Sequence, residues 1–214
     1  LEQEKGITIK LKAVRMDHEV NGEEYQLNLI DTPGHVDFSY EVSRSLAACE
    51  GAVLVVDASQ GIQAQTVSNV YKALEADLTI IPVLNKIDLT SAEVDKVTQD
   101  LIDTFGFKRE EILFVSAKTG EGVELLLEEV VAKVAPPTGD VNAPARALIF
   151  DTFYDEFLGV VAIIKVETGV FSKDLISTRG KIKFFATRAT SVPEDIGVLI
   201  PTRKSKIDLH AGEV

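Results

Sequence analysis

Cysteine is almost absent from this chain: Cys49 is the only one in 214 residues. This excludes an internal disulfide framework and a metal site built from cysteines, and it fits a reducing compartment. The sequence has no run of 18 apolar residues and no secretory signal peptide. Basic residues are few, 22 against 34 acidic ones, and the net charge of −12 argues against broad binding to a nucleic-acid backbone. These absences are typical of a globular protein. A length of 214 residues gives room for one large or two modest domains.

Strand-like and helix-like patterns alternate over the first two thirds of the chain. An Asn21-Gly22 pair between the first two strands predicts a tight hairpin, since both turn positions need positive φ. Continuous apolar runs at 52–56 and 78–84 are typical of buried parallel strands. The sequence therefore predicts an α/β fold with a doubly wound, mostly parallel sheet. The expected strands are 7–17, 25–30, 52–56, 78–84 and 112–115, and the expected helices are 36–49, 66–75, 91–105 and 122–134.

The pattern changes after a stretch rich in proline and glycine. We predict a linker at 138–145, because three prolines and a glycine interrupt the chain between 136 and 144. Beyond it, short β segments are separated by Gly, Pro and Asp, which predicts a small β-barrel over 146–214. The first domain is then 1–137. We expect the barrel to be incomplete at its end, since no clear final element precedes Val214.

One motif, Asp31-Thr32-Pro33-Gly34-His35, closes the second expected strand, where α/β folds place ligands. Asp31 can hold a hydrated Mg²⁺, and Gly34 lets its backbone N–H approach a phosphate oxygen. His35 is placed to orient an attacking water during phosphoryl transfer. An ordinary strand-to-helix turn, with Pro33 and Gly34 as turn formers, explains the same five residues without a ligand.

A second motif, Asn85-Lys86-Ile87-Asp88, follows a buried strand. A carboxylate at Asp88 can accept hydrogen bonds from the N1–H and the exocyclic amine of guanine, a pairing that adenine cannot match. Asn85 would bond nearby loops or the base, and the Lys86 stem would cover one face of the base. A polar loop with a helix cap is the alternative.

Two shorter motifs complete the set. Ser116-Ala117-Lys118 follows the last expected strand, where the Ala117 N–H would meet the guanine carbonyl oxygen and Lys118 would pack on the ring. In Gly6-Ile7-Thr8-Ile9 the Thr8 hydroxyl would ligate Mg²⁺. Taken singly, the first is also a surface turn and the second a strand start. All four motifs stand in order at strand ends, which predicts GTP binding with Mg²⁺.

The phosphate-cradling pattern G-x-x-x-x-G-K-[ST] occurs nowhere in the 214 residues. Since Leu1 falls just before the Gly6–Ile9 motif, we expect the chain to be a fragment whose phosphate loop precedes it. The fragment alone is then expected to be inactive, or to serve only as an interaction module.

The segments 5–9 and 31–38 together resemble the translational GTPases, the superfamily of elongation factors G and Tu. Three further stretches, 39–51, 61–66 and 199–214, are most similar to the LepA (elongation factor 4) family. The resemblance covers nearly the whole chain. One departure is Phe171-Ser172-Lys173-Asp174-Leu175, which lacks the Gly-Asp turn expected in the second domain.

The resemblance implies a P-loop-type GTPase sheet followed by the second domain of a translation factor. It makes Thr8 a magnesium ligand, Ile7 part of an apolar gate beside the catalytic His35, and Asp31–Gly34 the start of a switch segment. It implies ribosome-stimulated hydrolysis of GTP to GDP that controls elongation or translocation, with ribosomal RNA, ribosomal proteins and tRNA as partners. The implied protein is a cytoplasmic monomer, with an optional peripheral association with the bacterial inner membrane. Elongation factor G and BipA/TypA are the alternatives within the superfamily.

Overall fold

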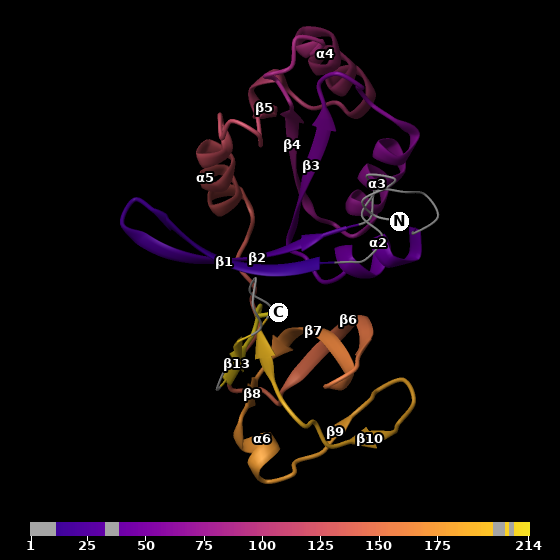
Figure 1. Ribbon diagram of the computed structural model, residues 1–214, viewed down its shortest axis with the longest axis vertical. Coiled ribbons are helices and arrows are strands. Elements are labelled where there is room, and N and C mark those ends of the chain that lie inside the picture. Colours follow the sequence, from indigo (N-terminus) through magenta and orange to yellow (C-terminus); the bar gives the residue numbers. More distant parts are fainter. Residues whose placement is uncertain (1–11, 33–38, 199–203, 206–207) are drawn as a thin grey trace. The chain divides into compact units, whose positions relative to one another are not determined.

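The computed structural model describes residues 12–32, 39–198, 204–205 and 208–214. Its contacts divide the chain into two compact units (Figure 1). The first is built mainly on Thr32–Ala135, and the second on Pro136–Val214 together with parts of the N-terminal hairpin.

A hairpin opens the described part of the chain. Strands β1 (Lys12–Val20) and β2 (Glu23–Asp31) form a two-stranded sheet. At its turn Asn21 has φ 53° and Gly22 has φ 82°, which confirms the predicted turn with two positive φ angles. β1 runs to Val20, beyond the predicted end at Asp17.

The first unit is centred on a parallel sheet of three strands in the order β3-β4-β5. They are β3 (Gly51–Asp57), β4 (Thr79–Asn85) and β5 (Leu113–Phe114). The register aligns Asp57 of β3 with Asn85 of β4, so these strands end together. Loops that leave the carboxyl ends of the strands therefore meet at one edge of the sheet.

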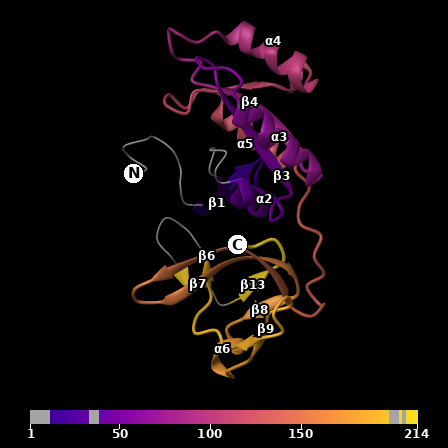
Figure 2. The ribbon, with the colours of Figure 1, turned by 90° about the vertical axis from the view of Figure 1, so that its right-hand side faces the viewer.

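Helices cover both faces of this sheet, as Figure 2 shows from the side. On one face Leu84 of β4 packs with Val97 and Leu101 of α4. On the other face Ile81 and Val83 pack against α5. The doubly wound α/β arrangement predicted from the apolar runs is confirmed. The helices are α2 (Ser39–Leu46), α3 (Ala64–Glu75), α4 (Val94–Phe105) and α5 (Val123–Lys133), with a short 3₁₀ turn, η2 (Arg109–Glu111). No helix in the described part of the chain is long and apolar enough to cross a membrane.

The start of α4 and the proline within β4 are two local features that the sequence patterns do not explain. α4 begins at Val94, three residues after the predicted helix start at 91, with Glu93 as its N-cap residue and no side-chain cap. Pro82 lies inside β4, where proline is unusual. β5 pairs only with Val83 and Leu84, so the β5 side of β4 is open at Pro82 and a missing N–H is tolerated there.

The second unit is β-rich, as predicted. Its long antiparallel pair is β6 (Arg146–Asp155) with β7 (Gly159–Thr168), and its core contains the buried residues Val166, Val198 and Leu209. Where the expected Gly-Asp turn is lacking, β8 (Val170–Ser172) leads into the short helix α6 (Asp174–Ser177). The other strands are β9 (Ile182–Lys183), β10 (Thr190–Ser191), β11 (Gly197–Val198), β12 (Lys204–Ser205) and β13 (Asp208–His210), which pair antiparallel as β9-β10, β11-β12 and β8-β13.

Candidate functional site

Two of the predicted motifs lie at the carboxyl edge of the parallel sheet. Asn85 is the last residue of β4, with Lys86–Asp88 directly after it, and Ser116–Lys118 follows β5. Asp31 closes β2 with an exposed side chain, and Thr32 follows it half-buried. The remaining predicted site residues, Ile7, Thr8, Pro33, Gly34 and His35, lie outside the described residues.

Asn85 joins the two loops. Its side-chain Oδ1 accepts a hydrogen bond from the Lys86 N–H at 2.8 Å and from the Ala117 N–H at 3.0 Å. One amide oxygen thus fixes the start of its own loop and the neighbouring loop. The Ala117 N–H, predicted to meet a base carbonyl, donates to Asn85 in this structure. A bound base would have to share or replace that bond.

Ser116 positions the carboxylate of Asp88. Its Oγ donates to Asp88 Oδ1 at 2.7 Å and accepts the Thr119 N–H at 3.2 Å. The Ser116 side chain is fully buried, whereas Asp88 is exposed. Ser116 therefore orients the Asp88 carboxylate, which lies at the surface. Ala117 and Lys118 are exposed beside it.

Lys86 is held by Asp57, a residue outside the four predicted motifs. Its Nζ lies 2.6 Å from Asp57 Oδ2, at the end of β3. The other oxygen of Asp57 accepts the Ser59 N–H at 2.8 Å and the Ser59 Oγ–H at 2.7 Å. Burial of Asp57 opposes its ionisation, but the hydrogen bonds from Lys86 and Ser59 outweigh it and lower the carboxyl pKa from 3.8 to about 2. The available sequence signal was an aspartate directly after the apolar run 52–56.

The edge therefore offers an exposed carboxylate, a lysine stem of fixed direction and two tethered loops. This donor and acceptor set suits a planar base with adjacent N–H groups.

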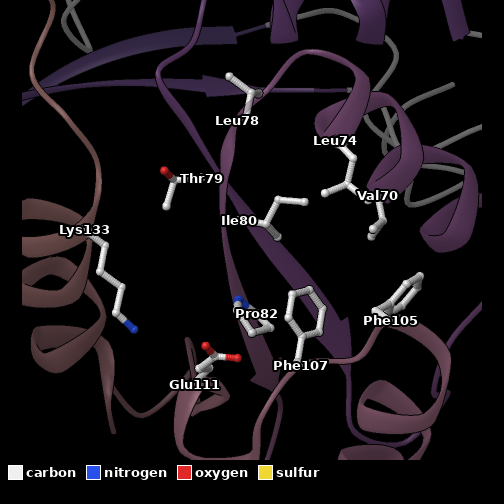
Figure 3. A pocket seen from close by; sticks show the side chains of 10 residues that line it. All are labelled: Val70, Leu74, Leu78, Thr79, Ile80, Pro82, Phe105, Phe107, Glu111 and Lys133. Carbon is white, nitrogen blue, oxygen red and sulfur yellow. The ribbon is translucent and has the colours of Figure 1, made fainter.

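A separate cavity of about 440 Å³ lies toward the other end of β4, lined by Ile80, Pro82 and Phe107 among others (Figure 3). Its lining contains none of the predicted site residues.

Comparisons with known proteins show the family of the chain. Residues 1–136 match the family model of the elongation factor Tu GTP-binding domain. Over all 214 residues the chain is 55% identical to an elongation factor 4 of Phocaeicola vulgatus and 54% identical to those of Flavobacterium johnsoniae and an Arthrobacter species. It covers 34–35% of these proteins, so the chain spans about a third of their length.

Among solved structures, the bacterial selenocysteine-specific elongation factor EF-Sec has the same fold. The TM-score is 0.77 at 23% identity, over 99% of this chain and 36% of that one. The predicted fold class, a parallel α/β domain followed by a β-rich one, is confirmed. The resemblance to translational GTPases, and to elongation factor 4 among them, is confirmed as well. The chain belongs to the family of the elongation factor Tu GTP-binding domain.

Proposed function

We propose that the protein containing this chain is a ribosome-associated GTPase of the LepA (elongation factor 4) type. It would hydrolyse GTP to GDP and phosphate and so control elongation or translocation. The observation that carries the proposal is the meeting of Asn85, Asp88 and Ser116 at the carboxyl edge of the sheet, where one hydrogen-bonded unit presents an oriented carboxylate. The names of the similar proteins support the elongation factor 4 type over elongation factor G or BipA/TypA.

In this proposal the carboxyl edge of the parallel sheet recognises guanine. Asp88 accepts from the N1–H and the exocyclic amine of the base, and a base without this donor pair would leave the carboxylate unpaired. The Lys86 stem covers one face of the ring, and Lys118 packs beside Ala117 on the other loop. Asn85 and Ser116 hold the two loops in the geometry that this pairing requires.

The phosphate end is assigned to Asp31, Thr32, Pro33 and Gly34, with Ile7, Thr8 and His35. In this proposal the Gly34 N–H contacts the γ-phosphate, and His35, beside the apolar Ile7, positions the attacking water. Asp31 is an exposed carboxylate at a strand end, which suits Mg²⁺ because this ion takes few carboxylates and keeps several waters. Together with Thr8, Asp31 would hold the ion, which neutralises charge on the phosphates when bound.

The proposal also covers the wider organisation. It assigns 1–137 to the GTP-binding domain, 138–145 to the linker and 146–214 to the second domain. Its partners are ribosomal RNA, ribosomal proteins and tRNA. The protein would act as a cytoplasmic monomer, and the peripheral inner-membrane association implied by the resemblance is a separate question for cell fractionation.

The test uses the complete polypeptide that contains this chain. Phosphate release from GTP is measured with and without ribosomes, for the wild type, His35→Ala and the control His210→Ala, which changes an exposed histidine of the second unit. We expect His35→Ala to lower the ribosome-stimulated rate by about 10²-fold or more and His210→Ala to leave it unchanged. An unchanged rate in His35→Ala removes that residue from its role. Ribosome binding without any GTP hydrolysis by the wild type would favour the interaction-module alternative.

A further inference from the structure

We infer that Asp57 is a positioning residue for nucleotide recognition: it holds the Lys86 ammonium so that the lysine stem lies ready to cover the base. The inference rests on the proposed guanine site and adds a residue from a strand that none of the motifs includes. Asp57 itself is not expected to contact the nucleotide.

Asp57 is held in place by contacts other than the ion pair with Lys86. It is the last residue of β3, in register with Asn85 of β4. Ser59 donates two hydrogen bonds to Oδ1, and the carbonyl of Asp57 accepts the N–H of Gly61 at 2.9 Å. Its side chain is 18% exposed. A carboxylate fixed in this way has one oxygen, Oδ2, directed at the neighbouring loop.

Lys86 is held at both of its ends. Its backbone has φ +65°, a left-handed conformation that side-chain-bearing residues rarely adopt, and its N–H is bound by Asn85. Its ammonium is bound by Asp57 at 2.6 Å. Because the backbone and the charged end are both fixed, the methylene stem between them has few conformations left.

This arrangement matters for binding because a free lysine loses much rotamer freedom when it packs on a ligand. A stem that is ordered beforehand loses less, and the ligand binds more tightly for the same contact. The ion pair also neutralises the ammonium, which leaves the apolar stem as the surface offered to the base.

Other lysine–carboxylate pairs of this unit differ in kind. Lys133 and Glu129, with 2.6 Å between Nζ and Oε2, belong to one helix and lie one turn apart. Such pairs contribute little beyond the helix itself. The Asp57–Lys86 pair instead joins the ends of two parallel strands beside the loop that carries Asp88. Glu129→Gln is therefore a matched control that removes a similar pair far along α5.

The experiment is a double-mutant cycle in the complete polypeptide that contains this chain. The dissociation constant for GDP is measured by calorimetry for the wild type, Asp57→Asn, Lys86→Met, the double variant and Glu129→Gln. Asn keeps an oxygen for Ser59, and Met keeps an apolar stem. We expect each single variant to raise the constant about three- to fivefold, the double variant to match Lys86→Met, and Glu129→Gln to have no effect.

A purely structural role for Asp57 would give a different pattern. Asp57→Asn would then weaken GDP binding by the same factor whether residue 86 is Lys or Met, and that additive result overturns the inference. A wild type that binds GDP while the cycle is additive defeats only the inference, whereas a wild type that does not bind GDP defeats the proposed function.

A second comparison protects the test against a variant that fails to fold. Lys86→Arg retains a cation for Asp57, so it should lose less GDP affinity than Lys86→Met does. Equal losses in Lys86→Arg and Lys86→Met also overturn the inference. Thermal unfolding of every variant is recorded alongside.

Discussion

Burial of the Asp57 side chain opposes its ionisation. Hydrogen bonds from Lys86 and Ser59 reverse that tendency and lower the pKa to about 2, below the 3.8 of a free carboxyl group. Because the folded chain binds this proton more weakly than the unfolded chain, the ionised form stabilises the fold. The difference corresponds to about 2 kcal/mol, present in full above about pH 5 and lost as the pH falls toward 2.

This predicts a pH-dependent difference between the wild type and Asp57→Asn. The unfolding free energy, measured in urea at pH 7 and at pH 3, should be about 2 kcal/mol lower for the variant at pH 7, and the gap should shrink at pH 3. A gap that stays constant over this range would mean that the carboxyl group is not coupled to Lys86 and Ser59 as described.

Asn85 gives a second prediction at the residue scale. Asn85→Ala removes the oxygen that accepts the N–H groups of Lys86 and Ala117, so both donors lose their partner. We expect the unfolding free energy to fall by about 1–3 kcal/mol, and amide exchange of Ala117 to become faster. Asn85→Asp keeps an oxygen of the same reach and serves as the control, with the larger part of the stability retained. Equal losses in both variants would show that the oxygen is not the cause.

At the scale of elements, the turn before α5 depends on a glycine. Gly122 has φ +72°, and a Cβ there would lie 2.1 Å from the carbonyl oxygen of Phe114. At Gly106, after α4, φ is +75° but a Cβ would meet nothing within 4 Å. Gly106→Ala therefore carries only the backbone penalty of about 1–2 kcal/mol. Gly122→Ala carries in addition a clash with backbone that cannot move away.

We predict that Gly122→Ala lowers the unfolding free energy by at least about 2 kcal/mol more than Gly106→Ala does. The measurement is urea unfolding of the two variants under the same conditions, with the Ser116–Asp88 contact followed by NMR. Equal losses in the two variants would contradict the close packing of Gly122 on β5.

The elements that the sequence predicts well are those with long patterns. The run at 78–84 lies in β4, which packs against helices on both faces, so its continuous apolar character reflects one simple environment. In the run at 52–56, Leu54 and Val56 pack in the core with α4, whereas Val53 and Val55 are exposed, so burial on both faces is not confirmed for β3. α6 and β9 span only a few residues, too few for any periodicity to develop. The predicted helix start at 91 fails for a different reason, because apolar periodicity does not mark the first residue of a helix, and α4 begins at Val94.

The sequence likewise predicts some contacts of the candidate site and misses others. The ends of β4 and β5 follow from the pattern, and therefore so does the meeting of Asp88 with Ser116. The pairing of Asp57 with Lys86 and the use of the Ala117 N–H by Asn85 depend on register and loop direction. Neither is encoded at a fixed spacing, so a motif search does not find them.

For the whole molecule, the two units differ in what they contribute. The parallel unit holds the motifs proposed to bind the base within its own loops, and the β-rich unit has a separate core around Val166 and Leu209. The contacts between Asn85, Asp88 and Ser116 all arise inside the first unit. The base-binding half of the proposed site is thus complete within one folding unit.

The last prediction follows from that division. The chain contains the base motifs but no G-x-x-x-x-G-K-[ST], whose backbone N–H groups and lysine supply most of the grip on a triphosphate. Guanosine, GDP and GTP should therefore bind the 214-residue chain with similar, weak affinities, and Asp88→Ala should abolish all three signals. NMR titration measures the affinities, with adenosine as the control ligand. Submicromolar GTP binding by this chain would contradict the prediction, because phosphate contacts from residues outside the proposed loop would then have to provide the affinity. A clear gain from guanosine to GTP at weaker affinity would locate part of the phosphate grip in the residues assigned to the phosphate end of the proposed site, among them Thr8 and Asp31–Gly34.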